Sequence, residues 1–438
     1  MIRRVAALVL LGIRAPLRSR LALGLLAPLA VVFAGIRGDG TVQGEVRMLL
    51  TWTLGAATAV LGAATLWAGC AAVASDIEAG RHASTAVSPA RPFEIWLGRW
   101  IGLVVVNGAL LFIAVAVAYA QLKIKGIPAE ATAVSRSLEL AVDTLHMEAE
   151  RLYAHAESQG AVPEGVPKAH IVASIEKDLL TGHFPVDPGQ SREWVFKLRP
   201  GDAAHAMTVK FKFLSSFGVS AGCMGECAVL NADGDVVASY ELAEDDKGEV
   251  AFDVPAGAVE GSSLKVLFTN TASDEGMAVL VQHGDSMTVL VPDGGVERNL
   301  FKSWIALLAL LSLLAAIGVA CGATFSFPVA AFTASALVLI AIVGRSDLAE
   351  EGREIRHSHG PVREKTAVER ALDAFSKTMS DGVVAVLKPM SEVRALDRLG
   401  DGLAISPCAV LRSVFYTGLL LPMGFGVLAA LALRRREL

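Results

Sequence analysis

The feature that most constrains this chain is a set of apolar runs that carry no charged residue. The runs cover residues 21–36, 48–75, 100–122, 303–344 and 413–433. A bilayer core needs about 20 apolar residues per helix, so the longest run holds two spans, separated by the helix-unfavourable GATFSFP at 322–328. The pattern predicts an α-helical polytopic membrane protein with six transmembrane helices, and at 53% hydrophobic residues the chain is too apolar for an ordinary soluble protein.

Short basic segments predict the orientation. Arginines gather before the first run, between the second and third runs, and after the last run, in Arg-Arg-Arg-Glu-Leu. Six spans place these three segments on one side, which the positive-inside rule makes cytoplasmic. We therefore expect a multi-pass protein of the bacterial cytoplasmic (inner) membrane with both termini in the cytoplasm. Residues 1–20 imitate a signal peptide but lack a small-residue cleavage site, so they predict a cytoplasmic interfacial helix.

The resulting organisation has six parts. Residues 21–122 hold transmembrane helices 1–3 with a cytoplasmic loop at 76–99, and residues 302–344 hold helices 4–5. Residues 411–438 hold helix 6 and a cytoplasmic tail. The polar segments 123–301 and 345–410 then lie outside the membrane, on the extracytoplasmic side.

The first polar segment predicts an inserted domain. Residues 128–158 carry apolar residues at helical spacing and predict a helix, which a Pro/Gly-rich linker at 160–168 follows. From 190 to 292 the period changes to two, with about eight β-rich runs separated by turn sequences such as NADGD. These runs predict an extracytoplasmic antiparallel β-sandwich. In the second polar segment, dense mixed charge precedes an expected amphipathic helix at 366–386.

Motifs for chemistry are missing from the sequence. It contains no Gly-x-x-x-x-Gly-Lys-Ser/Thr phosphate loop and no His-Glu-x-x-His. His357 and His359 form a His-x-His pair, which fits a solvated surface better than a metal site. The sequence therefore predicts a non-catalytic chain without a metal. Asn107, the main polar side chain inside a span, fits an interhelical contact better than a substrate ligand.

The cysteines leave one question open. Cys70, Cys321 and Cys408 lie in or beside apolar runs and fit packing roles. Cys223 and Cys227 flank Met-Gly-Glu in the expected extracytoplasmic domain, where the compartment permits oxidation. They could close a disulfide or remain two free thiols.

The cytoplasmic loop at 76–99 has a distinctive sequence, with an expected amphipathic helix from Asp76 to Ser88. Pro89 and Pro92 end this helix, and Phe93 begins a new one that leads into the third span. A short interfacial helix can dock into a cleft of a soluble partner, with charges that orient it and an apolar face that supplies contact area. The alternative is an ordinary connecting loop that carries positive-inside charges.

This loop resembles the coupling-helix region of the permeases in the type-2 family of ABC exporters. The matching positions are Glu78, Gly80, Pro89, Arg91, Gly98 and Arg99. The chain departs from the family pattern at Pro92, where an Arg is common. The expected interfacial N-terminal helix, the short connection between spans four and five, and the Pro-containing last span followed by an Arg-rich end also resemble that family.

The resemblance implies a membrane-spanning permease subunit. A separate ATP-binding subunit would bind ATP and Mg, and the charged residues Glu78, Arg81, Arg91 and Glu94 would orient and couple it. A second permease chain, identical or a sister, would complete the path. Membrane lipid and an extracytoplasmic protein are further expected partners, and nucleic acid is not.

The alternative function is a membrane scaffold that moves no cargo and transmits force from an ATPase to the outer domain. The two functions differ in what the spans should contain, since a path for polar cargo needs a polar face. The sequence offers only a modest one, made of Thr51, Thr53, Thr58, Thr65, Thr333 and Ser335.

Overall fold

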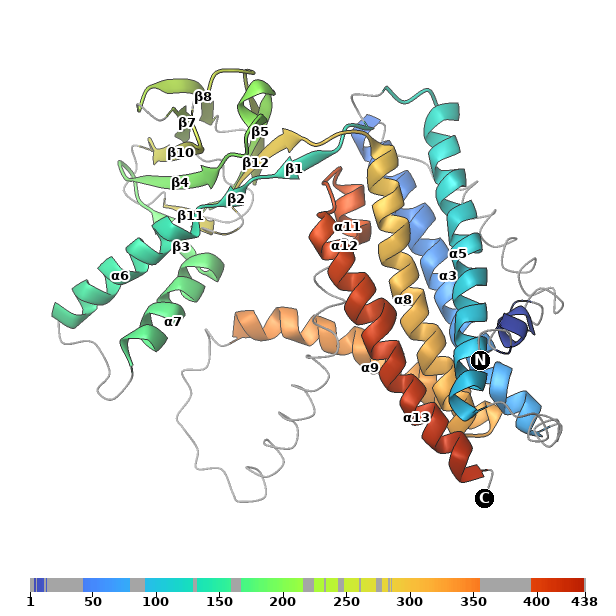
Figure 1. Cartoon of the computed structure of the whole chain (residues 1–438). Coiled ribbons are helices and arrows are strands. Elements are labelled where there is room, and N and C mark those ends of the chain that lie inside the picture. The colour runs from blue at the N-terminus through green and yellow to red at the C-terminus, as the bar shows by residue number, and fades with distance from the viewer. Residues whose placement is uncertain are drawn as a thin grey trace. The chain divides into compact units, whose positions relative to one another are not determined.

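The computed structural model (Figure 1) divides the chain into two compact units. One comprises Met1–Ala133 and Gly295–Leu438, and the other comprises Val134–Gly294. The structure describes residues 4, 6–11, 13, 42–78, 91–128, 132–158, 167–215, 224–231, 234–242, 248–259, 261–272, 278–282, 284, 286–354 and 395–436. The inserted unit is therefore narrower than the predicted segment 123–301, because α5 and α8 of the first unit extend beyond the apolar runs.

The first unit is helical. Its main elements are α3 (Val42–Glu78), α5 (Pro92–Ile124), α8 (Val296–Thr324), α9 (Phe327–Glu354), α11 (Ala395–Gly400), α12 (Pro407–Ser413), the π-helix η3 (Val414–Leu420) and α13 (Leu421–Arg436). The break between α8 and α9 lies within the predicted GATFSFP segment. The last span is longer than the apolar run, because Pro407 begins the helix and the Ser406 hydroxyl caps it by accepting the Ala409 N–H.

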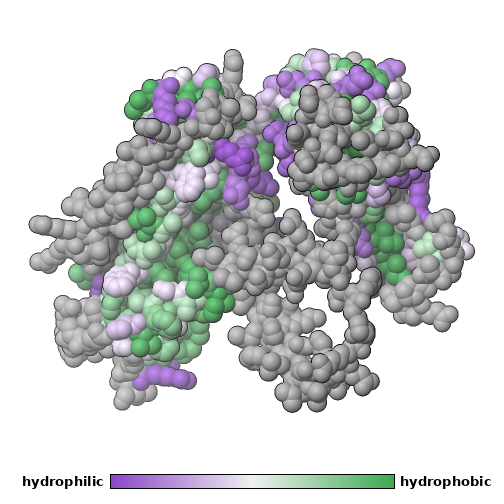
Figure 2. Space-filling model, turned by 180° about the vertical axis from the view of Figure 1, so that it is seen from behind, coloured by the Kyte–Doolittle hydropathy of each residue, from purple (hydrophilic) through white to green (hydrophobic). Residues whose placement is uncertain are grey.

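Among the described residues of this unit, four stretches are long and apolar enough to cross a membrane. They are Gly44–Ala74, Pro92–Ile124, Val296–Thr324 and Pro407–Arg435. The chain is therefore a membrane-embedded protein. The fifth predicted span corresponds to a shorter apolar helical stretch, Phe327–Ile340, and the first, at 21–36, lies outside the described residues. Figure 2 shows a mainly hydrophobic surface along the helices, with hydrophilic side chains towards their ends.

Helix α8 lies at the centre of the helical unit, where it packs against α3, α5, α9 and α13. Glycines allow α3 and α8 to approach backbone to backbone. A Cβ atom at Gly318 would lie 2.7 Å from the Leu66 carbonyl oxygen, and one at Gly322 would lie 2.4 Å from that of Cys70. Gly318 and Gly322 are four residues apart, the spacing of small residues that lets membrane helices pack closely.

The inserted unit contains antiparallel sheets. One has the strand order β1-β12-β5-β9 and a second has the order β2-β4-β10-β7-β8, while β3, β11 and β6 form a small third sheet. The strands are β1 (Ser135–Ser137), β2 (Glu139–Leu140), β3 (His183–Val186), β4 (Ser191–Lys197), β5 (Met207–Lys212), β6 (Leu214–Ser215), β7 (Gly225–Leu230), β8 (Val236–Leu242), β9 (Glu249–Val254), β10 (Ser263–Asn270), β11 (Val279–Gln282) and β12 (Met287–Pro292).

A single core joins the two larger sheets. Trp194 of β4 and Phe268 of β10 come from one sheet, and Phe211 of β5 comes from the other; all three are fully buried. The ring centroids of Phe211 and Phe268 lie 4.6 Å apart. Alternate residues of β9 and β10 point into this core, as a two-residue period requires. The unit is thus a β-sandwich, and all eight predicted strands are present.

The predicted helix at 128–158 is wrong over its first part. Residues 135–140 form β1 and β2, and the helix α6 begins only at Val142 and ends at Ser158. Leu138 fitted the helical spacing, but it packs in the sandwich core, because Ser-Arg-Ser-Leu-Glu-Leu also satisfies an alternating pattern. The sequence analysis also missed helix α7 (Lys168–Thr181), which follows the linker, and β3 before residue 190. The predicted helix at 366–386 and the pair His357 and His359 lie outside the described residues.

Helices α6 and α7 pack against each other through Ala149, Tyr153, Val172 and Leu179. His146 on α6 contacts Glu176 on α7, and this hydrogen bond raises the pKa of the exposed imidazole above its ordinary value.

Candidate functional site at the start of α5

The structure describes only part of the predicted coupling segment. Glu78 is the last residue of α3, and Arg91 precedes α5. Gly80, Arg81 and Pro89 lie outside the described residues. The segment nevertheless connects two long apolar helices, so its ends are fixed by the bundle.

Arg91 and Glu94 interact at the first turn of α5. The backbone N–H of Arg91 donates to Glu94 Oε2 at 3.2 Å, and Pro92 occupies the first helical position. This is one of the two hydrogen bonds of a capping box. The other would run from the backbone N–H of Glu94 to the side chain of Arg91, but an arginine side chain has no acceptor. Glu94 is only 5% exposed, whereas Arg91 is exposed. The structure therefore gives Glu94 a capping role, and the Arg91 side chain is the more accessible of the two.

Gly98 lies against the N-terminal helical segment. Residues 6–11 are helical, and a Cβ atom at Gly98 would lie 2.4 Å from the Cβ of Leu8. Any larger residue at this position would push the two segments apart. Arg99, the next residue, is half-buried. The structure therefore brings together the N-terminal helix and the C-terminal part of the predicted coupling segment.

Two tryptophans fix the start of α5 in the bundle. Trp96 and Trp100 stack with ring centroids 5.3 Å apart, and both are buried. A Cβ atom at Gly426 of α13 would lie 2.5 Å from the Trp96 ring. Trp100 Nε1 donates to the Ser312 carbonyl of α8 at 3.0 Å. Displacement of the start of α5 would therefore displace α8 and α13 as well.

These packing residues were missed in the sequence analysis. The aromatic-rich sequence Phe-Glu-Ile-Trp-Leu-Gly-Arg-Trp was a usable signal, because buried tryptophans concentrate contact area. Their partners Ser312 and Gly426 are more than 200 residues away in the sequence. Only the folded arrangement could identify them.

Most of the predicted polar side chains of α3 and α5 face the interior of the chain. Thr65 Oγ1 donates to Asn107 Oδ1 at 3.0 Å, which joins α3 to α5. This contact agrees with the interhelical interpretation of Asn107. Thr53, Thr58 and Thr65 are all buried within the bundle, while on α9 Thr333 is half-buried and Ser335 exposed. Three of the four predicted polar side chains of α3 are thus buried within the chain, and the fourth, Thr51, is half-buried.

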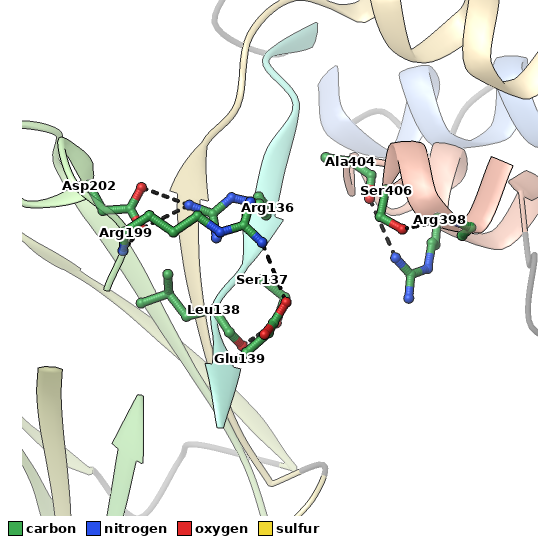
Figure 3. Close-up of polar contacts among 10 residues, drawn as sticks. Arg136, Ser137, Leu138, Glu139, Arg199, Asp202, Arg398, Ala404 and Ser406 are labelled. Carbon is green, nitrogen blue, oxygen red and sulfur yellow. Dashed lines mark hydrogen bonds and ion pairs between the residues drawn. The ribbon is translucent and has the colours of Figure 1, made fainter. Parts of the chain in front are cut away.

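A second polar cluster closes the opposite end of the bundle. Asn299 of α8 bonds the backbone of residues 403 and 405 twice: its Nδ2 donates to the Leu403 carbonyl at 3.0 Å, and its Oδ1 accepts the Ile405 N–H at 2.9 Å. Lys302 Nζ donates to the Ile405 carbonyl at 2.7 Å. Arg398 Nη1 reaches the Ala404 carbonyl at 3.5 Å (Figure 3). These bonds hold the segment before the last span against α8.

Neither the protein-family models nor the curated proteins contain a match to this chain. The resemblance to the type-2 exporter permeases therefore rests on the sequence features named above. Among the described residues, no group of three or more His, Cys, Asp or Glu side chains could hold a metal ion.

The cysteines have separate environments. Cys227 lies in β7 and is fully buried in the sandwich core, beside Phe268 of β10. Cys223 lies outside the described residues, so the disulfide remains a prediction. Cys70 of α3 and Cys321 of α8 share one buried apolar cluster, and Cys408 is exposed.

In the inserted unit the best-defined charged contact is between β1 and a loop. Arg136 Nη2 lies 2.7 and 2.8 Å from the two carboxylate oxygens of Asp202, which also accepts the Arg199 N–H at 2.9 Å (Figure 3). Desolvation raises the pKa of Asp202, but the Arg136 and Arg199 hydrogen bonds outweigh it and lower the pKa below its ordinary value. This contact fixes the first strand of the domain.

Proposed function

We propose that this chain is the membrane-spanning permease subunit of an ATP-driven ABC exporter and works with a separate ATP-binding subunit. The supporting observation is the way the start of α5 is built. A charged segment on the predicted cytoplasmic side connects two membrane helices, and its end is locked through Gly98, Trp96 and Trp100 to the N-terminal helix, α13 and α8. A partner that pushed this segment would move several helices together.

In this proposal Glu78, Arg81 and Arg91 orient the ATPase subunit, while Glu94 keeps the helix start in place. ATP and Mg bind to the partner subunit, and a second permease chain completes the assembly. The inserted sandwich lies on the extracytoplasmic side, where it receives cargo or binds a protein partner. The membrane is the bacterial cytoplasmic membrane, with both termini in the cytoplasm and six spans in total.

Charge reversal tests the proposal. We expect Glu78→Arg and Arg81→Glu to lower cargo-stimulated ATP hydrolysis at least tenfold while the chain still folds and inserts. Lys265→Glu, at a partly exposed position of β10 in the sandwich, is a matched control for the change in charge. Before these variants are made, purification of the tagged chain in mild detergent should reveal a stoichiometric P-loop ATPase. Absence of any ATPase would contradict the proposal.

The second candidate is a force-transmitting scaffold without cargo. It is favoured by the burial of Thr53, Thr58 and Thr65 inside the bundle, which leaves only the half-buried Thr51 of the predicted polar face of α3 partly accessible to a hydrophilic substrate. A lipid-like cargo would tolerate the same apolar surface. Reconstitution of the chain with an ATPase distinguishes the exporter from the scaffold. The scaffold is favoured if lipids and amphiphiles leave the rate of ATP hydrolysis unchanged while cross-linking of the sandwich changes it.

A further inference from the structure

The last span changes its helical form in the middle. Residues 414–420 form the π-helix η3 between the α-helices α12 and α13. The Leu421 N–H bonds the Tyr416 carbonyl, five residues earlier, instead of the carbonyl four residues earlier. Short π-helical segments inside α-helices are rare and are frequently found at functional sites.

Pro422 explains why the regular helix fails here. In an α-helix the Gly418 carbonyl would accept the N–H of residue 422, but proline has none. Ser312 of α8 supplies the missing donor, because its hydroxyl donates to the Gly418 carbonyl at 3.0 Å. Ser312 is 4% exposed, so water cannot easily replace this bond.

Ser312 also connects the π-helix to the start of α5. Its backbone carbonyl accepts the Trp100 Nε1–H, while its hydroxyl bonds Gly418. Gly418 allows this close approach, since a Cβ atom there would lie 3.3 Å from the Cβ of Ala309. One residue of α8 thus holds two helices through hydrogen bonds.

A buried hydroxyl of η3 lacks a hydrogen bond. Thr417 is buried, and its Oγ1 has no hydrogen-bond partner among the described residues. In α3 the buried Thr58 bonds the carbonyl four residues earlier at 2.7 Å, although the buried Thr53 of the same helix does not. A regular α-helix would offer Thr417 the same bond. The π-helix therefore satisfies Gly418 through Ser312 but leaves Thr417 unsatisfied.

The two sides of η3 are anchored in different places. Val410 and Val414 pack with Ile405 and Ala306 in one buried cluster. On the other side of η3, Ala429 and Leu433 belong to the cluster that contains Trp96 and Trp100. The last span is therefore packed within the bundle on both sides of η3, so a change of helical form in η3 would move one packed end relative to the other.

We propose that residues 414–420 are a hinge that switches between π-helical and α-helical forms, and that the Ser312–Gly418 hydrogen bond holds the π form. A shift of one residue in the helical register rotates α12 against α13 by about 100°. The hinge would let the segment ahead of the last span change its contacts while α13 stays packed on Trp96. This inference does not depend on the proposed exporter function.

A double-mutant cycle tests the hinge on the full chain in lipid nanodiscs. We expect Ser312→Ala to lower the thermal midpoint by several degrees, because it removes the buried hydrogen bond to the Gly418 carbonyl. Pro422→Ala supplies an N–H, so it should remove most of that loss in the double mutant. Ser303→Ala is the matched control: Ser303 is buried on the same helix but bonds the Asn299 carbonyl of its own helix, and Pro422→Ala should not rescue it. The proposal would be overturned if Ser312→Ala lowered the thermal midpoint equally in the wild-type chain and in the Pro422→Ala variant.

A distance measurement tests the switch itself. Genetically encoded spin labels at Leu411 and Leu431, both exposed and on opposite sides of η3, report the bend of the span. We expect a broad distance distribution for the wild-type chain and a narrower, shifted one for Pro422→Ala. Identical distributions would show that residues 414–420 do not act as a hinge. Neither measurement requires an ATPase subunit, so their outcome is separable from that of the charge-reversal test.

Discussion

The helical unit and the inserted sandwich are stabilised by different forces within one chain. In the sandwich, aromatic and branched side chains such as Trp194, Phe211 and Phe268 leave water, so apolar burial provides the stability. In the helical unit, lipid is as apolar as the side chains, and little stability comes from hiding them. There the backbones of α3 and α8 meet at Gly318 and Gly322. Small residues therefore contribute most to the stability of the helical unit, and large apolar residues contribute most to the stability of the sandwich.

The largest expected effect is the addition of volume at the α3–α8 contact. Gly318→Leu places a side chain where the Leu66 carbonyl oxygen lies only 2.7 Å from the Cβ position. Because backbone cannot yield as a flexible side chain can, we expect loss of folded protein, measured as the monodisperse fraction in fluorescence-detected gel filtration. Gly424→Leu is the control, since no described residue outside its own helical turns comes within 4 Å of its Cβ position. If Gly318→Leu and Gly424→Leu gave the same monodisperse fraction, close backbone packing would not be what stabilises the helical unit.

In the sandwich the removal of volume should be the damaging change. Phe268→Ala empties a fully buried site next to Phe211, and we expect a loss of about 4 kcal/mol in the free energy of unfolding. Hydrogen exchange of β10 amides in the full chain measures it. Val236→Ala, at an exposed position in β8, should change the same quantity by less than about 0.5 kcal/mol. A mild effect of Phe268→Ala would show that the core is not a single packed unit.

Electrostatics should contribute less than core packing and should depend on pH. Arg136→Met leaves Asp202 without its main partner, and we expect a loss of about 2 kcal/mol in the free energy of unfolding at pH 7. The folded-state pKa of Asp202 lies below its ordinary value, so its contribution is present above the unfolded pKa, near 4. That contribution disappears as the pH falls through the folded pKa.

The difference between wild type and Arg136→Met should therefore shrink below about pH 4. Hydrogen exchange of β1 and β12 at several pH values checks it. Glu193→Gln breaks the exposed pair with Lys265 and should cost less than about 1 kcal/mol. A difference that stays constant down to pH 2 would exclude the Asp202 carboxylate as its source.

The smallest expected effect concerns a hydrogen bond within the membrane. Thr65→Val removes the bond to Asn107, and membrane hydrogen bonds of this kind contribute on average about 0.6 kcal/mol. Thermal unfolding in nanodiscs should show a midpoint lowered by only a degree or two. Thr58→Val, which removes only a bond within α3, is the matched control. A loss as large as that from Phe268→Ala would mean that polar contacts, and not close backbone packing, hold the helices.

Much of the fold follows from local patterns in the sequence. Charge-free apolar runs predicted the long helices, and the alternating runs predicted β8 and β9 with the bounds that the structure gives. Residues 135–140 misled the prediction because Leu138 satisfies both the helical and the alternating period. Helix α7 was missed because it directly follows a Pro/Gly-rich stretch, which predicts a linker.

The site was less predictable than the fold. Gly98, Arg91 and Glu94 stood out in the sequence, but what each contacts did not. The packing of Gly426 on Trp96 and the bonding of Ser312 to Gly418 join positions separated by more than 100 residues. Such contacts depend on how the helices cross, and the local periodicity of the sequence does not predict the crossing geometry.

The inserted sandwich enters and leaves the chain at adjacent points. The Val134 N–H bonds the Gly294 carbonyl at 3.2 Å, and the Asp293 N–H bonds the Val134 carbonyl at 2.7 Å. Residues 134 and 294 are therefore neighbours in space although a whole domain separates them in the sequence. The domain is therefore an insertion with a single point of attachment to the rest of the chain. A few glycines in place of residues 134–294 would reconnect residues 133 and 295, so one deletion would separate the membrane bundle from the sandwich.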